Sequence, residues 1–69
     1  LKLREKSINL NTAGADELVS LPGIGESTAE KIIEYRNKKG KFKKIQDIMN
    51  VKGIGQKKFD NIKEYLVVE

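Results

Sequence analysis

Apolar residues recur at helical spacing in four stretches of this chain, separated by polar and charged residues. Ala29 and Ile32 fall on one helical face of the longest stretch, and Phe59, Ile62 and Leu66 form one stripe of the last. The predicted helices span residues 15–20, 26–38, 45–50 and 56–66. Strict alternation of apolar and polar residues is nowhere long enough for a sheet, so we predict an all-α fold.

The same pattern occurs twice, at a shift of thirty positions. The paired residues are Leu18 with Ile48, Leu21 with Val51, Ile32 with Ile62, Glu34 with Glu64 and Tyr35 with Tyr65. Each copy, about 11–39 and 42–67, is a helix, a turn and a second helix, which is too small to bury its own apolar face. We predict one domain over 8–69, with two copies packed about a pseudo-twofold axis, after a linker or frayed arm over 1–7.

Both copies have the same kind of turn between their helices. The turns are Leu21-Pro22-Gly23-Ile24-Gly25 and Val51-Lys52-Gly53-Ile54-Gly55. The first glycine permits a positive φ, and the second lets a bulky ligand come close. We expect both isoleucines to point into the core and the backbone amides to face outward. Such a turn opens a helix with unpaired N–H groups at the positive end of its dipole, which suits a phosphate.

Other residues indicate where the helices start and stop. Asn11 and Thr12 are good helix-start residues, and Pro22 ends the first helix. Gly40 follows the long second helix, where we expect it to form a left-handed cap. Phe42 is expected to fill the seam between the copies.

The composition excludes several functional classes. The chain has 69 residues with no Cys and no His, which excludes thiol nucleophiles, disulfides, the usual zinc sites and an imidazole base. A domain of this size has little volume for a deep substrate pocket, and we expect no cofactor, no metal and no small-molecule substrate. No run of about 20 apolar residues is present. Because the chain starts at Leu1, we expect it to be a piece of a longer protein.

The net charge of +4 is unevenly distributed. Residues 1–30 carry three basic and five acidic groups, or −2, whereas residues 31–69 carry eleven basic and five acidic groups, or +6. A lysine-rich stretch is often only a solvated face, but here it coincides with the second turn. This coincidence favours a polyanionic partner.

The turns and the residues around them resemble a known family. The residues that carry the resemblance are Ile8-Asn9-Leu10-Asn11-Thr12-Ala13, the two turns, Ala29, Ile32-Ile33-Glu34-Tyr35-Arg36 and Gly40-Lys41-Phe42. In this order they resemble paired helix-hairpin-helix motifs, and residues 8–68 resemble the DNA-binding domain of the ComEA family of competence proteins. A lone Gly-x-Gly would carry little weight, whereas this ordered set covers most of the chain.

The resemblance implies a SAM-like four-helix domain that binds double-stranded DNA without sequence preference, as a receptor in DNA uptake. It implies a monomer outside the cytoplasmic membrane, held there by an anchor or export signal elsewhere in the parent protein. The implied phosphate-binding residues are Gly23, Ile24, Gly25, Ser27, Thr28, Lys52, Gly53, Ile54, Gly55, Lys57 and Lys58. Some similar motifs also hold a monovalent ion in the turns, a point that the residues leave open.

The two copies differ in the first turn of the helix that follows. The residues are Glu26, Ser27 and Thr28 in copy one and Gln56, Lys57 and Lys58 in copy two. An exposed Glu26 repels a phosphate by up to about 1 kcal/mol at low salt, so we expect copy two to contribute more affinity. Further basic residues either extend the contact or simply match a helix dipole in solvent: Arg36, Lys38, Lys39, Lys41, Lys43 and Lys44.

Two other functions stay open. The chain could be a protein-docking module that has lost the phosphate role, which Glu26 favours, or the DNA-binding domain of a cytoplasmic repair protein. A dinucleotide site is rejected because a helix, not a strand, precedes Gly23 and because Thr28 stands where the third glycine belongs. An enzyme is not expected, since the chain is too small to enclose a flipped base. Tyr35 and Tyr65 are expected at the rim of the core rather than stacked on bases.

Overall fold

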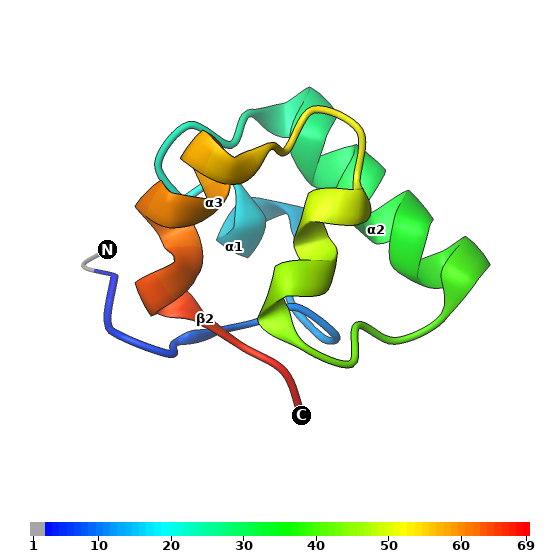
Figure 1. Ribbon diagram of the computed structural model, residues 1–69, viewed down its shortest axis with the longest axis horizontal. Coiled ribbons are helices and arrows are strands. Elements are labelled where there is room, and N and C mark those ends of the chain that lie inside the picture. Colours follow the sequence, from blue (N-terminus) through cyan, green and yellow to red (C-terminus); the bar gives the residue numbers. More distant parts are fainter. Residues whose placement is uncertain (1–2) are drawn as a thin grey trace.

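Two helical hairpins pack against each other in the computed structural model, which describes residues 3–69 (Figure 1). Leu1 and Lys2, part of the expected arm, lie outside the described residues. The elements are β1 (Ile8–Asn9), α1 (Ala15–Leu18), α2 (Glu26–Lys39), the 3-10 helix η1 (Ile45–Asn50), α3 (Gln56–Ile62), the 3-10 helix η2 (Lys63–Tyr65) and β2 (Leu66–Val67). Copy one supplies α1 and α2, and copy two supplies η1 and α3. The predicted all-α class is confirmed, since the only strands in the described residues are two residues long.

The first helix is shorter than the predicted 15–20. After Leu18, the Ser20 and Leu21 amides donate to carbonyls three residues earlier, at 3.2 and 3.1 Å, so the helix tightens into a turn. Pro22 explains this ending, because the residue before a proline is disfavoured in the helical conformation. Gly14 is the N-cap of α1.

Asn11 does not start a helix, contrary to the prediction. Its side-chain oxygen accepts the Phe42 amide at 2.7 Å, and its side-chain nitrogen donates to the Phe42 carbonyl at 3.0 Å. This pair of hydrogen bonds joins the N-terminal segment to the connection between the copies. Phe42 is buried, as predicted, and its ring stacks on Tyr35 with centroids 5.1 Å apart.

Gly40 ends α2, as predicted, with φ 90°. Its ψ of −172° lies outside the left-handed helical region, in a conformation that only glycine adopts readily. The expected position of the cap is therefore right, and the expected conformation is wrong. Gly40 still donates its amide to the Arg36 carbonyl at 3.0 Å, which closes the last turn.

The last helix does not reach Leu66, contrary to the prediction. α3 ends at Ile62, η2 follows, and β2 then pairs in parallel with β1, with Ile8 opposite Leu66 and Asn9 opposite Val67. The reason is long-range: the start of the chain offers β2 a hydrogen-bonding partner, and the Leu10 amide donates to the Val67 carbonyl at 3.0 Å.

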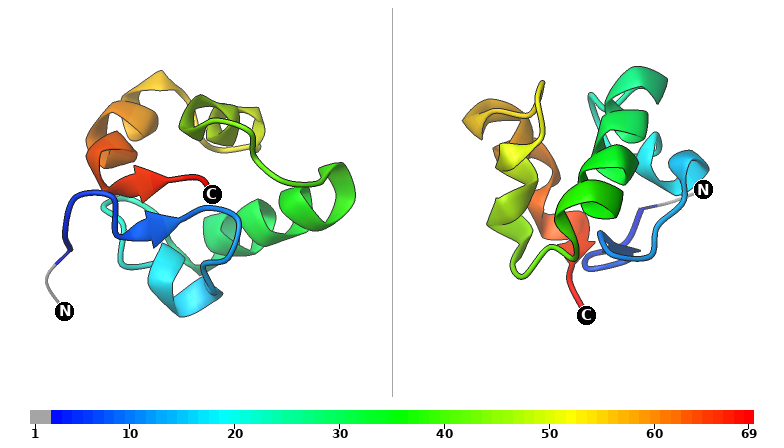
Figure 2. Two further views of the ribbon diagram at one scale, coloured as in Figure 1. Left: turned by 90° about the horizontal axis from the view of Figure 1, so that it is seen from below. Right: turned by 90° about the vertical axis from the view of Figure 1, so that its right-hand side faces the viewer.

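Residues before β1 also contact the domain. The Lys6 amide donates to the Glu64 carbonyl at 2.9 Å, and Leu3 packs against the core. The described part of the expected arm therefore contacts η2, and β1 and β2 run side by side (Figure 2). The domain boundary near residue 8 stays a prediction.

The core repeats the symmetry of the sequence. Residues 21–30 and 51–60 show the same order of buried and exposed positions. Ile24 and Ile54 are 4% and 3% exposed, which confirms that both turns are anchored by their isoleucines. Ala29 and Phe59 are also both buried, so the two helix crossings accommodate side chains of very different size at matching positions.

Candidate nucleic-acid interface

Each turn between the paired helices is a tight β-turn closed by its isoleucine. We call residues 21–25 the first hairpin and residues 51–55 the second hairpin. The Ile24 amide donates to the Leu21 carbonyl and the Ile54 amide to the Val51 carbonyl, both at 3.1 Å. The glycine before each isoleucine has a positive φ, 78° in the first hairpin and 98° in the second. A positive φ at the third position and a bond from the fourth residue to the first are typical of a type II turn.

This geometry corrects part of the predicted site. The amides of Ile24 and Ile54 are among the expected phosphate donors, but both already have acceptors inside their own turns. Their side chains are buried as well. These two residues therefore hold the hairpins in shape and offer no donor to a ligand.

The helices that follow the hairpins begin without a capping side chain. Gly25 and Gly55 are the N-caps of α2 and α3, with φ −92° and −100°. The first helical bonds run from the Ala29 amide to the Gly25 carbonyl, at 2.9 Å, and from the Phe59 amide to the Gly55 carbonyl, at 3.0 Å. No hydrogen bond donated by the amide of either N-cap glycine occurs in residues 3–69. The amides ahead of these first bonds are free of helical partners, as at any helix start.

The two hairpins lie beside each other at one end of the molecule. They form the top of Figure 1 and of the right-hand view of Figure 2, away from the C-terminus. A Cβ atom placed on Gly23 would lie 3.9 Å from Cε of Lys58, which belongs to the other copy. Lys58 Nζ also donates to the Gly53 carbonyl at 3.4 Å. Lys58 thus contacts the second hairpin and lies close to Gly23 of the first.

Side chains around the hairpins differ between the copies. Lys52 and Lys57 are exposed beside the second hairpin, and Lys58 is half-buried. At the corresponding positions of copy one, Ser27 is exposed and Thr28 is half-buried. Both copies therefore have polar side chains in the first helical turn after the hairpin, but only copy two supplies positive charge there.

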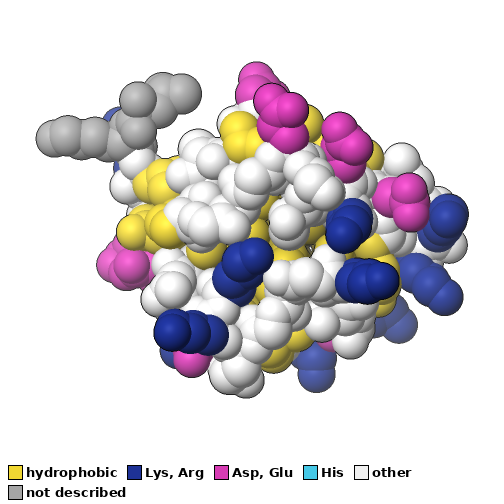
Figure 3. All heavy atoms as spheres, turned by 90° about the horizontal axis from the view of Figure 1, so that it is seen from above, with side chains coloured by type: hydrophobic (Ala, Val, Ile, Leu, Met, Phe, Trp, Pro, Cys, Tyr) yellow, Lys and Arg dark blue, Asp and Glu magenta, His cyan; other side chains and the backbone are white. Residues whose placement is uncertain are grey.

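Acidic residues gather on the other side of copy one. Asp16, Glu26 and Glu30 line a shallow hollow with Ala15 and Val19. In Figure 3, which looks down on the hairpin end, acidic side chains gather along one edge while lysine and arginine side chains lie across the middle and the far side. Glu26 thus belongs to an acidic cluster with Asp16 and Glu30.

The basic residues expected to extend the contact do not all face solvent. Arg36 Nη1 donates to the carbonyls of Leu10 and Ala13, at 3.0 and 2.7 Å, so this guanidinium holds the N-terminal segment against α2. Arg36 therefore has a structural role, which the sequence did not predict. Lys38 is exposed and forms an ion pair with Glu34 at 3.6 Å.

Lys31 is a residue that the sequence reasoning missed. It lines a groove together with Lys38, Lys39 and, from the second hairpin, Lys52. The spacing of Lys31, Lys38 and Lys39 along one helix is a signal that could have revealed their common face. Lys52 could not have been added to it without the tertiary structure.

Most of the chain matches a known protein family. A family described as "Helix-hairpin-helix motif" matches residues 4–67. The chain belongs to the helix-hairpin-helix family. Because this match includes both copies, the paired helix-hairpin-helix architecture predicted from the sequence is confirmed.

Similar helix-hairpin-helix segments occur in proteins from bacteria and animals. ComE operon protein 1 of Bacillus subtilis is 47% identical over 62 residues, which is 90% of this chain and 30% of that protein. Endonuclease/exonuclease/phosphatase family domain-containing protein 1 of Danio rerio is 41% identical over 61 residues, which is 88% of this chain and 11% of that protein. The chain therefore spans less than a third of either relative.

The described residues contain neither of two other kinds of feature, a metal-binding cluster and a membrane-spanning helix. Within residues 3–69 no group of three or more His, Cys, Asp or Glu side chains is placed to hold a metal ion. Across the same residues, no helix combines the length and the apolar character needed to cross a membrane.

Proposed function

We propose that this domain binds double-stranded DNA without reading its base sequence, by holding backbone phosphates at the two hairpins. The observation that carries the proposal is the pair of glycine N-caps, Gly25 and Gly55. Serine, threonine, aspartate and asparagine are favoured at this position because their side chains satisfy the first helical amides. Both helices do without such a cap, which leaves these donors available to an external anion.

Neither backbone strain nor packing among the described residues requires glycine at the two N-caps. Their φ values of −92° and −100° suit any residue. A Cβ atom on either Gly25 or Gly55 would meet no other atom within 4 Å, so packing does not exclude a side chain. Glycine is itself a tolerated N-cap residue, and without a Cβ atom it also lets a ligand approach the backbone closely.

The arrangement of the two hairpins suits one duplex better than two separate ligands. They lie side by side, with Lys58 of the second copy close to Gly23 of the first, so phosphates held by each would be close together. Contacts to phosphate fix the position of a protein on DNA and carry no sequence information. We propose that the second hairpin dominates, because Lys52 and Lys57 flank it while Glu26 opposes an anion at the first.

The biological role that we propose is a receptor for DNA in uptake, outside the cytoplasmic membrane of a bacterium. This rests on the resemblance to the ComEA family and on the match to ComE operon protein 1 of Bacillus subtilis. Segments elsewhere in the parent protein would supply the attachment. We propose that the domain itself is monomeric and not catalytic, because the match to the animal proteins named for endonucleases covers only 11% of the Danio rerio protein.

The test titrates the domain into each of two duplexes of unrelated sequence and measures binding by fluorescence anisotropy at several salt concentrations. If four or five phosphates are neutralised, log K should fall against log salt with a slope of about −3.6 to −4.5, and Kd should be about 10⁻⁴ to 10⁻⁶ M for both duplexes. Absence of binding to either duplex at low salt would contradict the proposal and favour a protein-docking module. A large difference between the two sequences would contradict the sequence-independent mode.

A further inference from the structure

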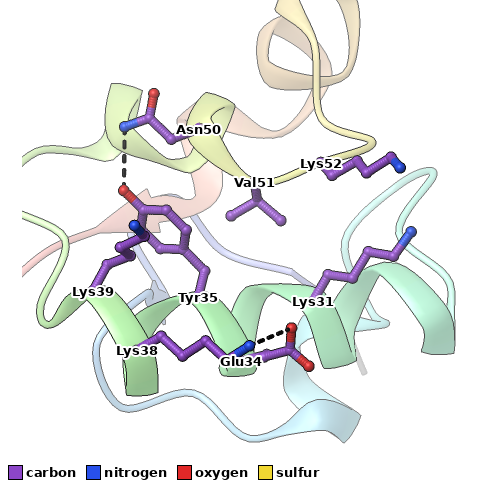
Figure 4. A pocket seen from close by; sticks show the side chains of 8 residues that line it. All are labelled: Lys31, Glu34, Tyr35, Lys38, Lys39, Asn50, Val51 and Lys52. Carbon is purple, nitrogen blue, oxygen red and sulfur yellow. Dashed lines mark hydrogen bonds and ion pairs between the residues drawn. The ribbon is translucent and has the colours of Figure 1, made fainter.

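A groove lies between α2 and the start of the second hairpin (Figure 4). It has a volume of about 280 Å³ and is open to solvent along its length. Lysines and Tyr35 line it from α2, and Asn50, Val51 and Lys52 close the opposite side. The proposed duplex contact uses only Lys52 of this set, so the rest of the groove has no role in it.

The floor of the groove is apolar and is organised around one aromatic ring. Tyr35 is half-buried, at the core rim as predicted, with its ring stacked on Phe42 at an interplanar angle of 20°. Its hydroxyl accepts a hydrogen bond from Asn50 Nδ2 at 3.3 Å. Val51 lies across the groove from it (Figure 4). The ring is therefore held in place before any ligand arrives, which lowers the entropy cost of stacking on it.

The rim of the groove is strongly basic. Four lysines surround it, against a single carboxylate, Glu34, which is paired with Lys38. In Figure 4, Lys31 and Lys52 reach out at the end near the second hairpin, and Lys38 and Lys39 lie toward the other end. The ligand that complements this groove is an anion with a flat apolar part.

We propose that this groove binds a nucleotide of single-stranded DNA, with the base against Tyr35 and the flanking phosphates on the lysines. A basic channel combined with an aromatic platform is the usual means of holding single strands without sequence preference. The groove is near the lower limit of about 300 Å³ for ligand pockets, which fits one unpaired base and excludes a base pair inside a stacked duplex.

Lys52 connects this groove to the proposed duplex site. It belongs to the second hairpin and also lines the groove, so a strand whose phosphates are held at the hairpin can pass directly into the groove once it is unpaired. The inference rests on the proposed function, because the duplex must be held at the hairpin. The domain then binds the junction between a duplex and a single strand more tightly than a blunt duplex.

The test compares a blunt duplex with the same duplex carrying a short thymidine tail, of either polarity, with 2-aminopurine as the first unpaired base. We expect at least one tail to increase affinity by about fivefold or more, and the 2-aminopurine fluorescence to be quenched on binding. Tyr35→Leu should abolish both the gain and the quenching while leaving the affinity for the blunt duplex unchanged.

Tyr65→Leu is the matched control, because Tyr65 is the repeat-related residue and also half-buried, but does not line the groove. The Glu64 carboxylate beside it raises the pKa of Tyr65, so the phenol is neutral and the substitution removes no charge. This variant should retain the gain from the tail. Should Tyr35→Leu melt too low to be tested, the exposed pair Lys31→Ala and Lys39→Ala serves instead and should reduce the gain from the tail.

The outcomes separate the two proposals. If the blunt duplex binds and neither tail polarity adds affinity, the groove inference is overturned and the proposed function stands. A gain that survives both Tyr35→Leu and the lysine pair would also overturn it. If no duplex binds at low salt, the proposed function fails and the junction inference fails with it.

Discussion

The side chain of Lys58 reaches from the second helical hairpin to Gly23 of the first, where its Cε lies 3.9 Å from the position of a Cβ atom. Its Nζ donates at the same time to the Gly53 carbonyl, at 3.4 Å. A single half-buried lysine therefore contacts the second glycine turn and lies close to the first. The two turns lie beside each other at one end of the molecule.

Replacement of Gly55 by aspartate should separate DNA affinity from stability. An N-cap aspartate accepts hydrogen bonds from the first helical amides, so we expect the free energy of unfolding to stay the same or to rise by a few tenths of a kcal/mol. The same carboxylate occupies the proposed phosphate position, so affinity for a duplex should fall by about tenfold or more. Thermal melting and anisotropy measure the two effects. A variant that binds DNA as well as the parent would refute the role of this N-cap.

Valine at the two N-cap positions should rank the hairpins. Gly55→Val should weaken duplex binding more than Gly25→Val, because the second hairpin is flanked by lysines and the first by Glu26. The backbone angles at both positions accept valine, so both variants should fold. Affinities measured at one salt concentration suffice. Equal losses of affinity, or a larger loss for Gly25→Val, would contradict the proposed dominance of the second hairpin.

Removal of Lys57 and Lys58 together should lower the salt dependence as well as the affinity. Each phosphate that the protein no longer neutralises should make the negative slope of log K against log salt shallower by about 1. The magnitude of the slope should therefore decrease by about 2. Ser27→Ala with Thr28→Ala is the matched change in copy one and should leave the slope unaltered. An unchanged slope in the lysine double variant would show that neither cation neutralises a phosphate of the duplex.

Loss of Arg36 should destabilise the fold and spare the interface. Its guanidinium donates to the carbonyls of Leu10 and Ala13, and hydrogen bonds to charged groups contribute about 1.5–3 kcal/mol. We expect Arg36→Ala to lower the melting temperature by about 4–8 °C for each kcal/mol of stability removed, with duplex affinity unchanged below the transition. Lys38→Ala, which breaks only an exposed ion pair, is the control and should cost about 0.5 kcal/mol or less. A folded Arg36→Ala variant with much weaker DNA binding would contradict this assignment.

Much of the architecture was predictable because it is local. The thirty-residue repeat, the helical spacing of Ala29 and Ile32, and the two Gly-Ile-Gly turns predicted the two helix pairs and the inward direction of Ile24 and Ile54. The helical spacing and the turns depend on residues a few positions apart, and the repeat shows the same local pattern twice. The largest error at a helix end arose where a distant segment intervened, at Leu66, which pairs with Ile8 instead of continuing the last helix.

By itself, the sequence determined the helix-hairpin-helix repeat and the glycine positions that could admit a phosphate. Only the tertiary structure decided which groups the basic side chains contact. It turned Arg36 inward onto Leu10 and Ala13, set Lys58 between the hairpins, and brought Lys52 to the groove that Lys31 and Tyr35 line. The physical reason is that periodicity fixes which face of a helix is buried, whereas the partner of a long charged side chain depends on which distant backbone or surface the fold brings within its reach.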